Sequence, residues 1–156
     1  MMSSCGTMVV CKIQGREGKI PVRAHATDAG IDFFAPLDME RTEVKPQHDI
    51  KIHTGIRVAV PRGWALLGVN KSGVATKKRL TLGAKLIDAD YRGELIIHLV
   101  NIGSESTWIE PGEKIAQFVL LEIGSHMVLE YSEEDYMRLF GNTERGEGGF
   151  GSTGTV

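Results

Sequence analysis

Long apolar runs are absent from this sequence. No stretch approaches the roughly 18 residues of a membrane span, and Met1–Cys5 has no basic region followed by a continuous apolar stretch, as a secretory signal would. Cysteine is also scarce, since only Cys5 and Cys11 are present. A disulfide between them is one alternative, and free thiols in a reducing compartment are the other. We expect a cytoplasmic or nuclear protein that makes no use of a membrane.

Strong charge of either sign is missing as well. The 18 Lys and Arg residues nearly balance the 20 Asp and Glu residues, for a formal net charge of -2. No basic field is therefore available to hold a long nucleic acid, although a few local cations could bind a small anion. The 42% hydrophobic content is ordinary for a soluble protein, and 156 residues suit one domain.

Several familiar catalytic motifs are absent too. The stretch from Gly63 to Ser72 has Val69 after its second glycine, where a phosphate-binding loop needs lysine. The His-x-Glu and Pro-Cys-x-x-Cys halves of a zinc nucleobase deaminase do not occur. The histidines have no metal-ligand spacing with cysteine, and no local motif indicates a Ser–His–Asp nucleophile; they are His25, His48, His53, His98 and His126.

Short apolar segments rich in Val, Ile and Leu make up most of the chain. Turn residues such as Pro61-Arg62-Gly63 and Glu110-Pro111-Gly112 separate them. This pattern predicts an all-β fold, a distorted jelly roll or barrel with at most one or two short helical turns. The expected strands are Met8–Ile13, Ile50–Val60, Trp64–Val69, Glu94–Asn101 and Lys114–Ile123.

Helical patterns are short. Ser132–Phe140 has a capping serine, an acidic first turn and Gly141 after its end, and a single turn could follow Ser72. We place the β-domain at residues 1–142 and a flexible glycine-rich arm at residues 143–156.

The composition of that arm fits two interpretations. It could be a functionless flexible end, since glycine carries a large entropic cost of ordering. It could also close over a ligand, with a cation and hydroxyls for phosphate and an aromatic plate for a base. The residues that would do this are Arg145, Phe150, Ser152 and Thr153.

Five polar clusters stand at the ends of the expected strands. Together they resemble, in order and spacing, the five motifs of the trimeric dUTPase family, over about residues 24–154. The third and fifth are the most specific, because Asp-Tyr-Arg-Gly and Arg-Gly-x-Gly-Gly-Phe-Gly-Ser-Thr-Gly rarely occur together by chance. The clusters are Asp28–Phe33, Asn70–Ala75, Gly83–Glu94, Gly112–Gln117 and the arm.

The resemblance implies hydrolysis of dUTP to dUMP and pyrophosphate, which keeps uracil out of DNA and supplies dUMP for dTMP synthesis. Asp88 would be the general base that activates the attacking water, although an isolated Asp there would be a turn residue. Tyr91 would lie under the deoxyribose and exclude a 2′-hydroxyl, or would simply pack in the core. A hairpin from Leu82 to Tyr91, including Lys85, Leu86 and Ile87, would bind uracil through backbone groups.

The other motifs would hold the triphosphate. Ser72, with Lys71 and the Gly73 amide, would bind it near the α,β bridge, and Gln117 would bind a phosphate oxygen. Asp32 would orient magnesium water or the sugar-binding hairpin, or would be a solvated turn carboxylate. Mg²⁺ would be carried on the triphosphate with no direct protein ligand. Arm residues would cover the uracil and take the γ-phosphate; they are Arg145, Phe150, Gly151, Ser152 and Thr153.

The resemblance also implies a homotrimer whose active sites combine motifs from neighbouring subunits. Two other functions share the scaffold: a dCTP deaminase, alone or combined with dUTPase activity, and a catalytically inactive nucleotide sensor. The complete glycine-rich fifth motif and the Asp-Ala-Asp-Tyr-Arg-Gly run favour the dUTPase.

Two residues depart from the family pattern. Lys71 stands where arginine is usual, which keeps the charge but loses the planar bidentate fork; some members, notably retroviral ones, also have lysine. Lys85 replaces the glycine that usually precedes the apolar pair before Asp88. A side chain there would be strained if the backbone needed a positive φ.

Overall fold

The computed structural model describes residues 6–124, 126–144, 146 and 148. The chain divides into two compact units, Met1–Gly124 and Ser125–Val156, and each is described by itself. This division falls before the boundary expected between residues 142 and 143, which stays a prediction.

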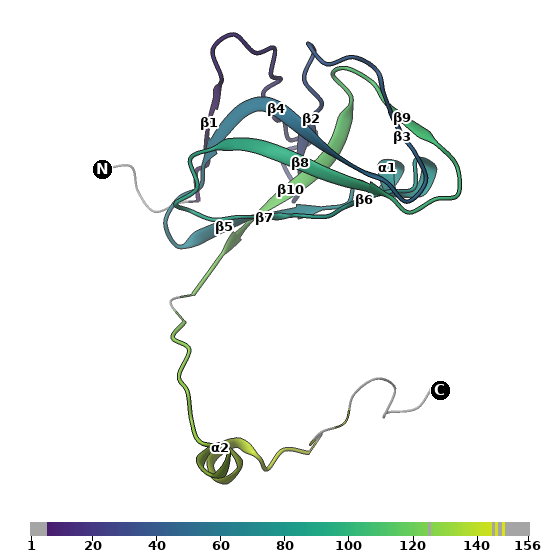
Figure 1. Ribbon diagram of the computed structural model, residues 1–156. Coiled ribbons are helices and arrows are strands. Elements are labelled where there is room, and N and C mark those ends of the chain that lie inside the picture. The colour runs from purple at the N-terminus through teal and green to yellow at the C-terminus, as the bar shows by residue number, and fades with distance from the viewer. Residues whose placement is uncertain (1–5, 125, 145, 147, 149–156) are drawn as a thin grey trace. The chain divides into compact units, whose positions relative to one another are not determined.

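Two four-stranded antiparallel sheets form the first unit (Figure 1). In order across the first sheet lie β1 (Val9–Lys12), β4 (Asp49–Ala59), β8 (Glu94–Asn101) and β6 (Leu80–Leu82). Across the second lie β2 (Ile31–Phe34), β10 (Lys114–Glu122), β5 (Trp64–Val69) and β7 (Leu86–Ile87). A two-stranded ribbon joins β3 (Thr42–Val44) to β9 (Thr107–Ile109).

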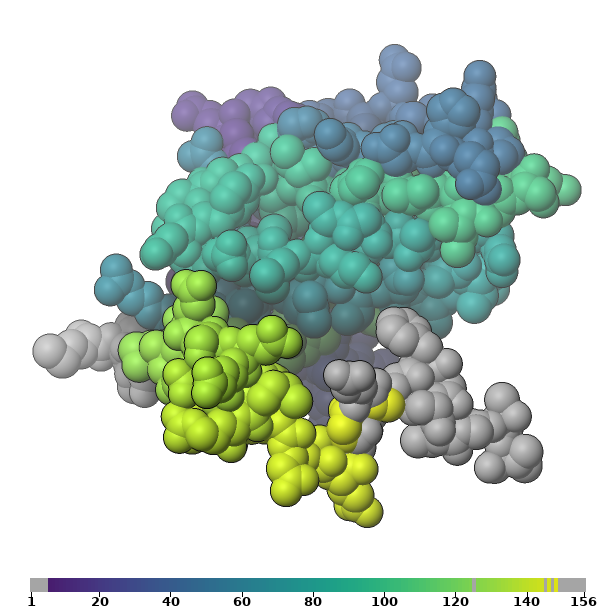
Figure 2. All heavy atoms as spheres, turned by 60° about the horizontal axis from the view of Figure 1, so that its bottom comes forward, coloured from purple at the N-terminus to yellow at the C-terminus, as the bar shows by residue number. Residues whose placement is uncertain are grey.

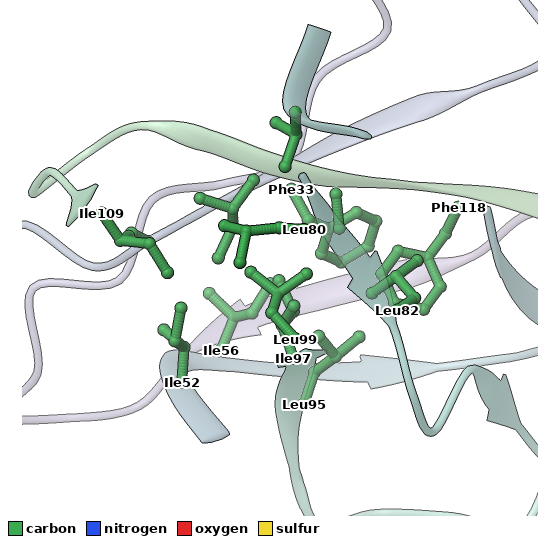
Figure 3. Close-up of a cluster of buried hydrophobic side chains, with 14 of the residues drawn as sticks. Phe33, Ile52, Ile56, Leu80, Leu82, Leu95, Ile97, Leu99, Ile109 and Phe118 are labelled. Carbon is green, nitrogen blue, oxygen red and sulfur yellow. The ribbon is translucent and has the colours of Figure 1, made fainter. Parts of the chain in front are cut away.

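Alternating burial along the strands builds one hydrophobic core between the sheets (Figure 3). In β8 every second residue is buried, so that Leu95, Ile97 and Leu99 point inward. From the other sheet Phe33 and Phe118 contribute rings whose centroids are 4.7 Å apart. Burial of each large apolar side chain stabilises the fold by about 1.5–3 kcal/mol, and this core holds the strand ends that carry the polar motifs.

The two helices are short, and α1 (Ser72–Lys77) contributes the buried Val74 to the core. This helix follows β5 directly and contacts β6. α2 (Glu133–Phe140) belongs to the second unit, where the Ser132 hydroxyl caps it by accepting a hydrogen bond from the Asp135 N–H at 3.1 Å. Tyr131 and Tyr136 pack on Phe140 with ring centroids 5.7 Å away, and Figure 2 shows this segment in yellow-green as a close-packed group of side chains.

The expected fold class is confirmed: the protein is all-β and jelly-roll-like, with two short helices. The five expected strands and both helical segments are present, with ends shifted by a residue or two. The sequence did not predict the shortest strands, because two to four residues are too few to establish a period; these are β2, β3, β6, β7 and β9. Among the residues described, no helix has both the length and the apolar character needed to cross a membrane.

The segment expected to be a hairpin has a different structure. β6 pairs with β8 in the first sheet, whereas β7 pairs with β5 in the second. The residues between Leu82 and Leu86 therefore cross from one sheet to the other rather than turning back within one.

Candidate active site

A buried carboxylate on β2 is held between two lysines. Asp32 is only 5% exposed, and its Oδ1 and Oδ2 each lie 2.9 Å from an ammonium group, Lys71 Nζ and Lys114 Nζ respectively. Burial acts to raise the pKa of Asp32, but hydrogen bonds from Lys114 and Lys71 and their charges outweigh it and lower the pKa below its ordinary value. Two ammonium groups and one carboxylate leave one net positive charge, which suits an anionic ligand. We call these three residues the lysine–carboxylate cluster.

Gln117 extends this cluster across the second sheet. On β10 it is the register partner of Asp32 on one side and of Val69 on the other. Its amide Nε2 donates to the Asn70 carbonyl oxygen at 3.2 Å. A Cβ added to Gly30 would lie 2.7 Å from Gln117 Oε1, so a side chain at this position would displace the amide. The first, second and fourth motifs thus meet at the Val69 end of β5.

Ser72 and Gly73 lie beside the cluster, at the start of α1. Both are exposed, and a Cβ built on Gly73 would meet nothing within 4 Å. Lys71 precedes them with an extended backbone, φ -75° and ψ 124°. This surface can therefore receive a ligand next to the cluster without moving other groups.

The third motif is exposed over most of its length. Lys85, Leu86 and Asp88 are exposed, whereas Ile87 is half-buried where β7 pairs with β5. Within the described ranges the Asp88 carboxylate has neither a hydrogen bond nor an ion pair, and the Asp88 carbonyl accepts from the Tyr91 N–H at 3.1 Å. A free, exposed carboxylate is able to take a proton from a water molecule. We call residues 83–91 the base segment.

Lys85 causes no backbone strain. Among the described residues other than glycine, only Gln47 and Arg79 have a positive φ. Lys85 therefore has an ordinary backbone, and the side chain replaces the usual glycine of this position without the strain considered above. Its carbonyl accepts a 2.6 Å hydrogen bond from the Gly68 N–H on β5.

Asp88 and the lysine–carboxylate cluster lie at opposite ends of β5. In the β5–β7 ladder Leu66 pairs with Ile87, so that Asp88 follows toward the Trp64 end. Asn70 and the lysine–carboxylate cluster lie beyond Val69 at the other end. The five residue steps from Ala65 to Asn70 span about 16 Å along an extended strand. The start of the third motif lies near the second, because the Asn70 Oδ1 accepts from the Leu82 N–H at 2.9 Å. Within one chain, however, the structure does not bring Asp88 together with the lysine–carboxylate cluster.

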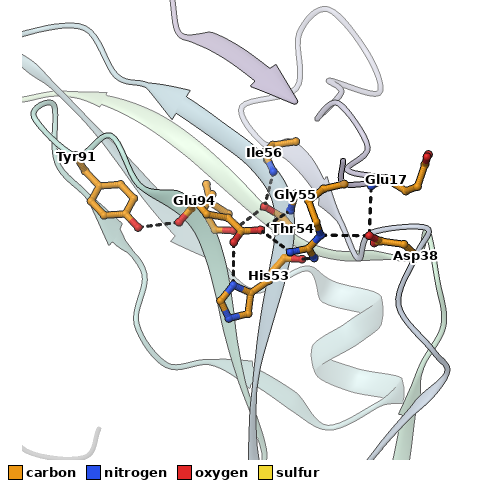
Figure 4. Close-up of polar contacts among 10 residues, drawn as sticks. Glu17, Asp38, His53, Thr54, Gly55, Ile56, Tyr91 and Glu94 are labelled. Carbon is orange, nitrogen blue, oxygen red and sulfur yellow. Dashed lines mark hydrogen bonds and ion pairs between the residues drawn. The ribbon is translucent and has the colours of Figure 1, made fainter. Parts of the chain in front are cut away.

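Tyr91 belongs to a polar network centred on Glu94 (Figure 4). The Tyr91 hydroxyl, on a residue 40% exposed, donates to the Glu94 carbonyl at 2.7 Å. The Glu94 carboxylate accepts from the Gly55 N–H at 2.8 Å and contacts His53 Nδ1 at 2.9 Å. Gly55 sits at a register shift of β4 with φ +72°, which glycine adopts without strain. The network ties the end of the base segment to the β4 irregularity.

Electrostatics keep Glu94 ionised. Burial of the carboxylate acts to raise its pKa, but hydrogen bonds from His53 and Gly55 and the nearby charge of Arg16 lower it below the ordinary value. Arg16 also contacts the Asp38 carboxylate at 3.2 Å, so the network continues toward the N-terminal loop (Figure 4). The Tyr91 hydroxyl is thus bound to a carbonyl of β8, and the Glu94 side chain anchors that part of β8 to its neighbours.

The described residues offer little direct ligation for a metal ion. In ranges 6–124 and 126–144 no group of three or more His, Cys, Asp or Glu side chains is placed to hold one. Both Asp32 oxygens are already bound by ammonium groups. These residues therefore suit an ion whose ligands are phosphate oxygens and water, such as Mg²⁺.

Two aspects of the site were not apparent from sequence. Lys114 was not expected as a site residue, although it stands in the fourth motif. It pairs with Phe34 in the β2–β10 ladder, two residues from Asp32, and its ammonium group reaches the Asp32 carboxylate. Glu94 ends the third motif without an expected role. The expected arm residues lie outside the described residues; they are Arg145, Phe150, Gly151, Ser152 and Thr153.

Comparisons with known proteins agree on one family. The family model described as dUTPase matches residues 16–154. The chain is 37% identical over 142 residues to a deoxyuridine 5′-triphosphate nucleotidohydrolase from Candida albicans, covering 91% of this chain and 85% of that one. The solved dUTPase of Staphylococcus bacteriophage 80alpha with dUpNHpp superposes with a TM-score of 0.81 at 30% identity, covering 95% of this chain and 98% of that chain.

A third relative concerns a metal. A variant dUTPase from phage phi11 of S. aureus, whose structure describes the coordination of a structural Mg(II) ion, has a TM-score of 0.71 at 27% identity, covering 81% of this chain and 97% of that one. Taken with the motifs and the all-β sandwich, the matches show that this chain belongs to the dUTPase family.

Proposed function

We propose that this protein hydrolyses dUTP to dUMP and pyrophosphate by in-line attack of an Asp88-activated water on the α-phosphorus. Membership of the family supports the conversion of dUTP to dUMP. The observation that carries the finer proposal is the division of the site. A positively charged cluster lies at one end of β5, and a free carboxylate with an anchored tyrosine lies at the other.

The lysine–carboxylate cluster supplies the phosphate end of the site. Its net positive charge, with exposed Ser72 and Gly73 beside it, favours the α- and β-phosphates. Asp32 sets the positions of both ammonium groups, and Gln117 offers its amide to a phosphate oxygen. Because Lys71 is already held by a hydrogen bond of 2.9 Å, the lack of an arginine fork costs little orientation.

Asp88 supplies the proton transfer. It accepts a proton as the water oxygen forms a bond to the α-phosphorus and the bond from that phosphorus to the α,β-bridging oxygen breaks. Pyrophosphate leaves with the electron pair of that bond, and dUMP remains. General base catalysis of this kind contributes about 10²–10⁴-fold in rate.

Tyr91 and the base segment supply selectivity. The Tyr91 ring, fixed through its hydroxyl to the Glu94 carbonyl, occupies the space that a ribose 2′-hydroxyl would need. Backbone donors and acceptors of the base segment pair with uracil, and cytosine presents the opposite pattern. Each buried polar group left unpaired costs about 1–3 kcal/mol.

A homotrimer would assemble the complete site. The two ends of β5 are about 16 Å apart along the strand, too far for one substrate phosphate to reach both in one chain. A closed threefold ring brings the base segment of one subunit beside the cluster of the next, with three equivalent interfaces. The arm of a third subunit would then cover the substrate.

Magnesium would be the cofactor, carried on the triphosphate. It would supply positive charge that offsets the charge of the phosphates. Asp32 would contribute only through water, because both of its oxygens are bound by lysine.

Product analysis tests the reaction directly. Purified protein is mixed with Mg²⁺ and dUTP, dCTP, dTTP or UTP in parallel. We expect dUMP and pyrophosphate from dUTP alone. A deoxyuridine product from dCTP would indicate a deaminase, and no product from any of the four would favour a nucleotide sensor.

Subunit mixing tests the composite site. Asp88→Asn and Lys71→Ala chains are denatured together and refolded at equal amounts. If the two ends come from different subunits, about a quarter of the sites in the mixed trimers have both a native Asp88 and a native Lys71, and activity returns. Separately refolded variants are the control. Activity in the mixture no higher than theirs would contradict the composite site.

A further inference from the structure

His98 lies in the middle of β8 and contacts the base segment through its side chain. The ring Nδ1 is 3.2 Å from the Ala84 backbone nitrogen, and the ring Nε2 is 2.9 Å from the Asp49 Oδ2 on β4. The ring is largely buried, with 25% of its side chain exposed. His98 and Asp49 have no role in the reaction as proposed above, whereas Ala84 belongs to the base segment.

These partners determine the state of the ring. A backbone N–H can only donate, so Nδ1 must be an acceptor without a proton. A neutral imidazole then carries its proton on Nε2, where the Asp49 carboxylate accepts it. The chain Asp49–His98–Ala84 therefore requires the neutral Nε2–H form of His98.

The contact holds the point where the chain crosses between sheets. From the first sheet, the His98 carbonyl accepts from the Gly83 N–H at 3.0 Å while the ring accepts from Ala84. From the second sheet, the Gly68 N–H donates to the Lys85 carbonyl at 2.6 Å. The three residues immediately before Leu86 are thus hydrogen-bonded to both sheets.

Gly83 shows how closely the ring packs. A Cβ built on Gly83 would lie 2.1 Å from His98 Nδ1, which no side chain could occupy without displacing the ring. Gly83 has no positive φ, so the close approach of the ring, and not the backbone conformation, requires glycine here. Ring and segment therefore fit as a pair.

We propose that His98 is a positioning residue for uracil selection. With Nδ1 accepting from the Ala84 N–H and Nε2–H directed at Asp49, it fixes the Ala84 amide and so sets the backbone of the base segment that binds the base. This inference rests on the proposed function, because it assumes that residues 83–91 bind uracil. It adds a residue on β8, outside the five motifs.

Two amide substitutions separate the two contacts of the ring. The oxygen of Asn lies near the position of Nδ1 and can accept from Ala84, whereas Gln reaches the position of Nε2 and keeps only the Asp49 contact. His98→Val removes both and suits a strand. His48→Val is the matched control, because among the described residues the polar contact of the His48 ring is to the nearby Pro46 carbonyl, at 2.9 Å.

The measurement is kcat and KM for dUTP and dCTP with each variant. For His98→Val and His98→Gln we expect KM for dUTP to rise about fivefold, the loss from one hydrogen bond, and dUTP-over-dCTP selectivity to fall, with kcat within about twofold. His98→Asn and His48→Val should keep the native KM. A native KM in His98→Val, or a KM in His98→Asn as high as in His98→Val, would overturn the proposal.

A second measurement distinguishes this inference from the proposed function. Nitrogen NMR of labelled wild-type protein should show a neutral His98 ring protonated on Nε2, and the Ala84 amide signal should shift in His98→Val but not in His98→Asn. Titration with dUMP should then be weaker for His98→Val. If the wild type hydrolyses no dUTP the proposed function fails, whereas an Nδ1–H ring or unchanged dUMP affinity overturns the role of His98.

Discussion

At the Val69 end of β5 a buried carboxylate binds two ammonium groups, whereas at the Trp64 end Asp88 and Tyr91 are exposed and Asp88 has no described partner. The first end has its charged groups held in place within one chain and bears a net positive charge. The second presents an exposed carboxylate on a segment held by backbone hydrogen bonds. Folding thus fixes the charged groups at one end and, under the proposed function, leaves the general base free at the other.

The largest expected effect is at the exposed end. Asp88→Asn removes the general base but little else, because the carboxylate makes no described contact. We expect turnover to fall by about 10²–10⁴-fold, with unchanged affinity for a non-hydrolysable dUTP analogue. Single-turnover kinetics and analogue titration measure the two quantities.

Glu43→Gln, which alters an exposed carboxylate on β3, is the control for that loss. Native turnover in Asp88→Asn would remove Asp88 from the mechanism.

A substitution at the Val69 end of β5 should instead change the free energy of unfolding. Asp32→Asn leaves two ammonium groups facing each other without a charge between them. Because both lysines are partly exposed and water can reach them, we expect a loss of about 2–3 kcal/mol rather than the larger cost of a fully buried pair. Urea unfolding monitored by circular dichroism measures it.

The same substitution should alter the dependence on pH. The folded-state pKa of Asp32 lies below the ordinary 3.8, so the unfolded chain binds this proton more readily. The stabilisation from the Asp32 ion pairs is fully present at pH values above the unfolded-state pKa and is lost as the pH falls through the folded-state pKa. Asp32→Asn should therefore show a shallower loss of stability below about pH 4. Parallel acid profiles for variant and wild type would contradict the ion-pair interpretation.

A smaller effect is expected where the base segment meets β8. Gly83→Ala places a methyl group against the His98 ring, and we expect a loss of about 1–2 kcal/mol from overpacking. His98→Val should remove most of this cost in the double variant. A double-mutant cycle of thermal unfolding measures the coupling, and additive effects would show that ring and glycine do not oppose each other.

The smallest effect is expected at Tyr91. Tyr91→Phe loses the hydrogen bond to the Glu94 carbonyl but keeps the ring. Stability should fall by about 0.5–1 kcal/mol, and UTP should still be rejected because the ring remains. Competition between dUTP and UTP measures this, and efficient UTP hydrolysis would show that the hydroxyl, rather than the ring, excludes the ribose.

Sequence patterns predicted the long strands well because eight or more alternating residues establish a period, as β8 shows. They failed for β7, whose two residues carry no period, and within the hairpin expected from Leu82 to Tyr91, where residues 83–85 cross between the sheets. A pattern within one segment does not specify which sheet a short strand joins. That choice depends on which partner strand offers free hydrogen bonds.

By itself the sequence determined the all-β class, the positions of the longer strands, and the identities of the motif residues. Only the tertiary structure decided that Lys114 and Lys71 share Asp32, that His98 meets Ala84, and that Asp88 and the lysine–carboxylate cluster lie at opposite ends of β5. Local patterns follow from the periodicity of a strand. Contacts between residues dozens of positions apart depend on strand register and sheet order, which the packing of the whole core selects.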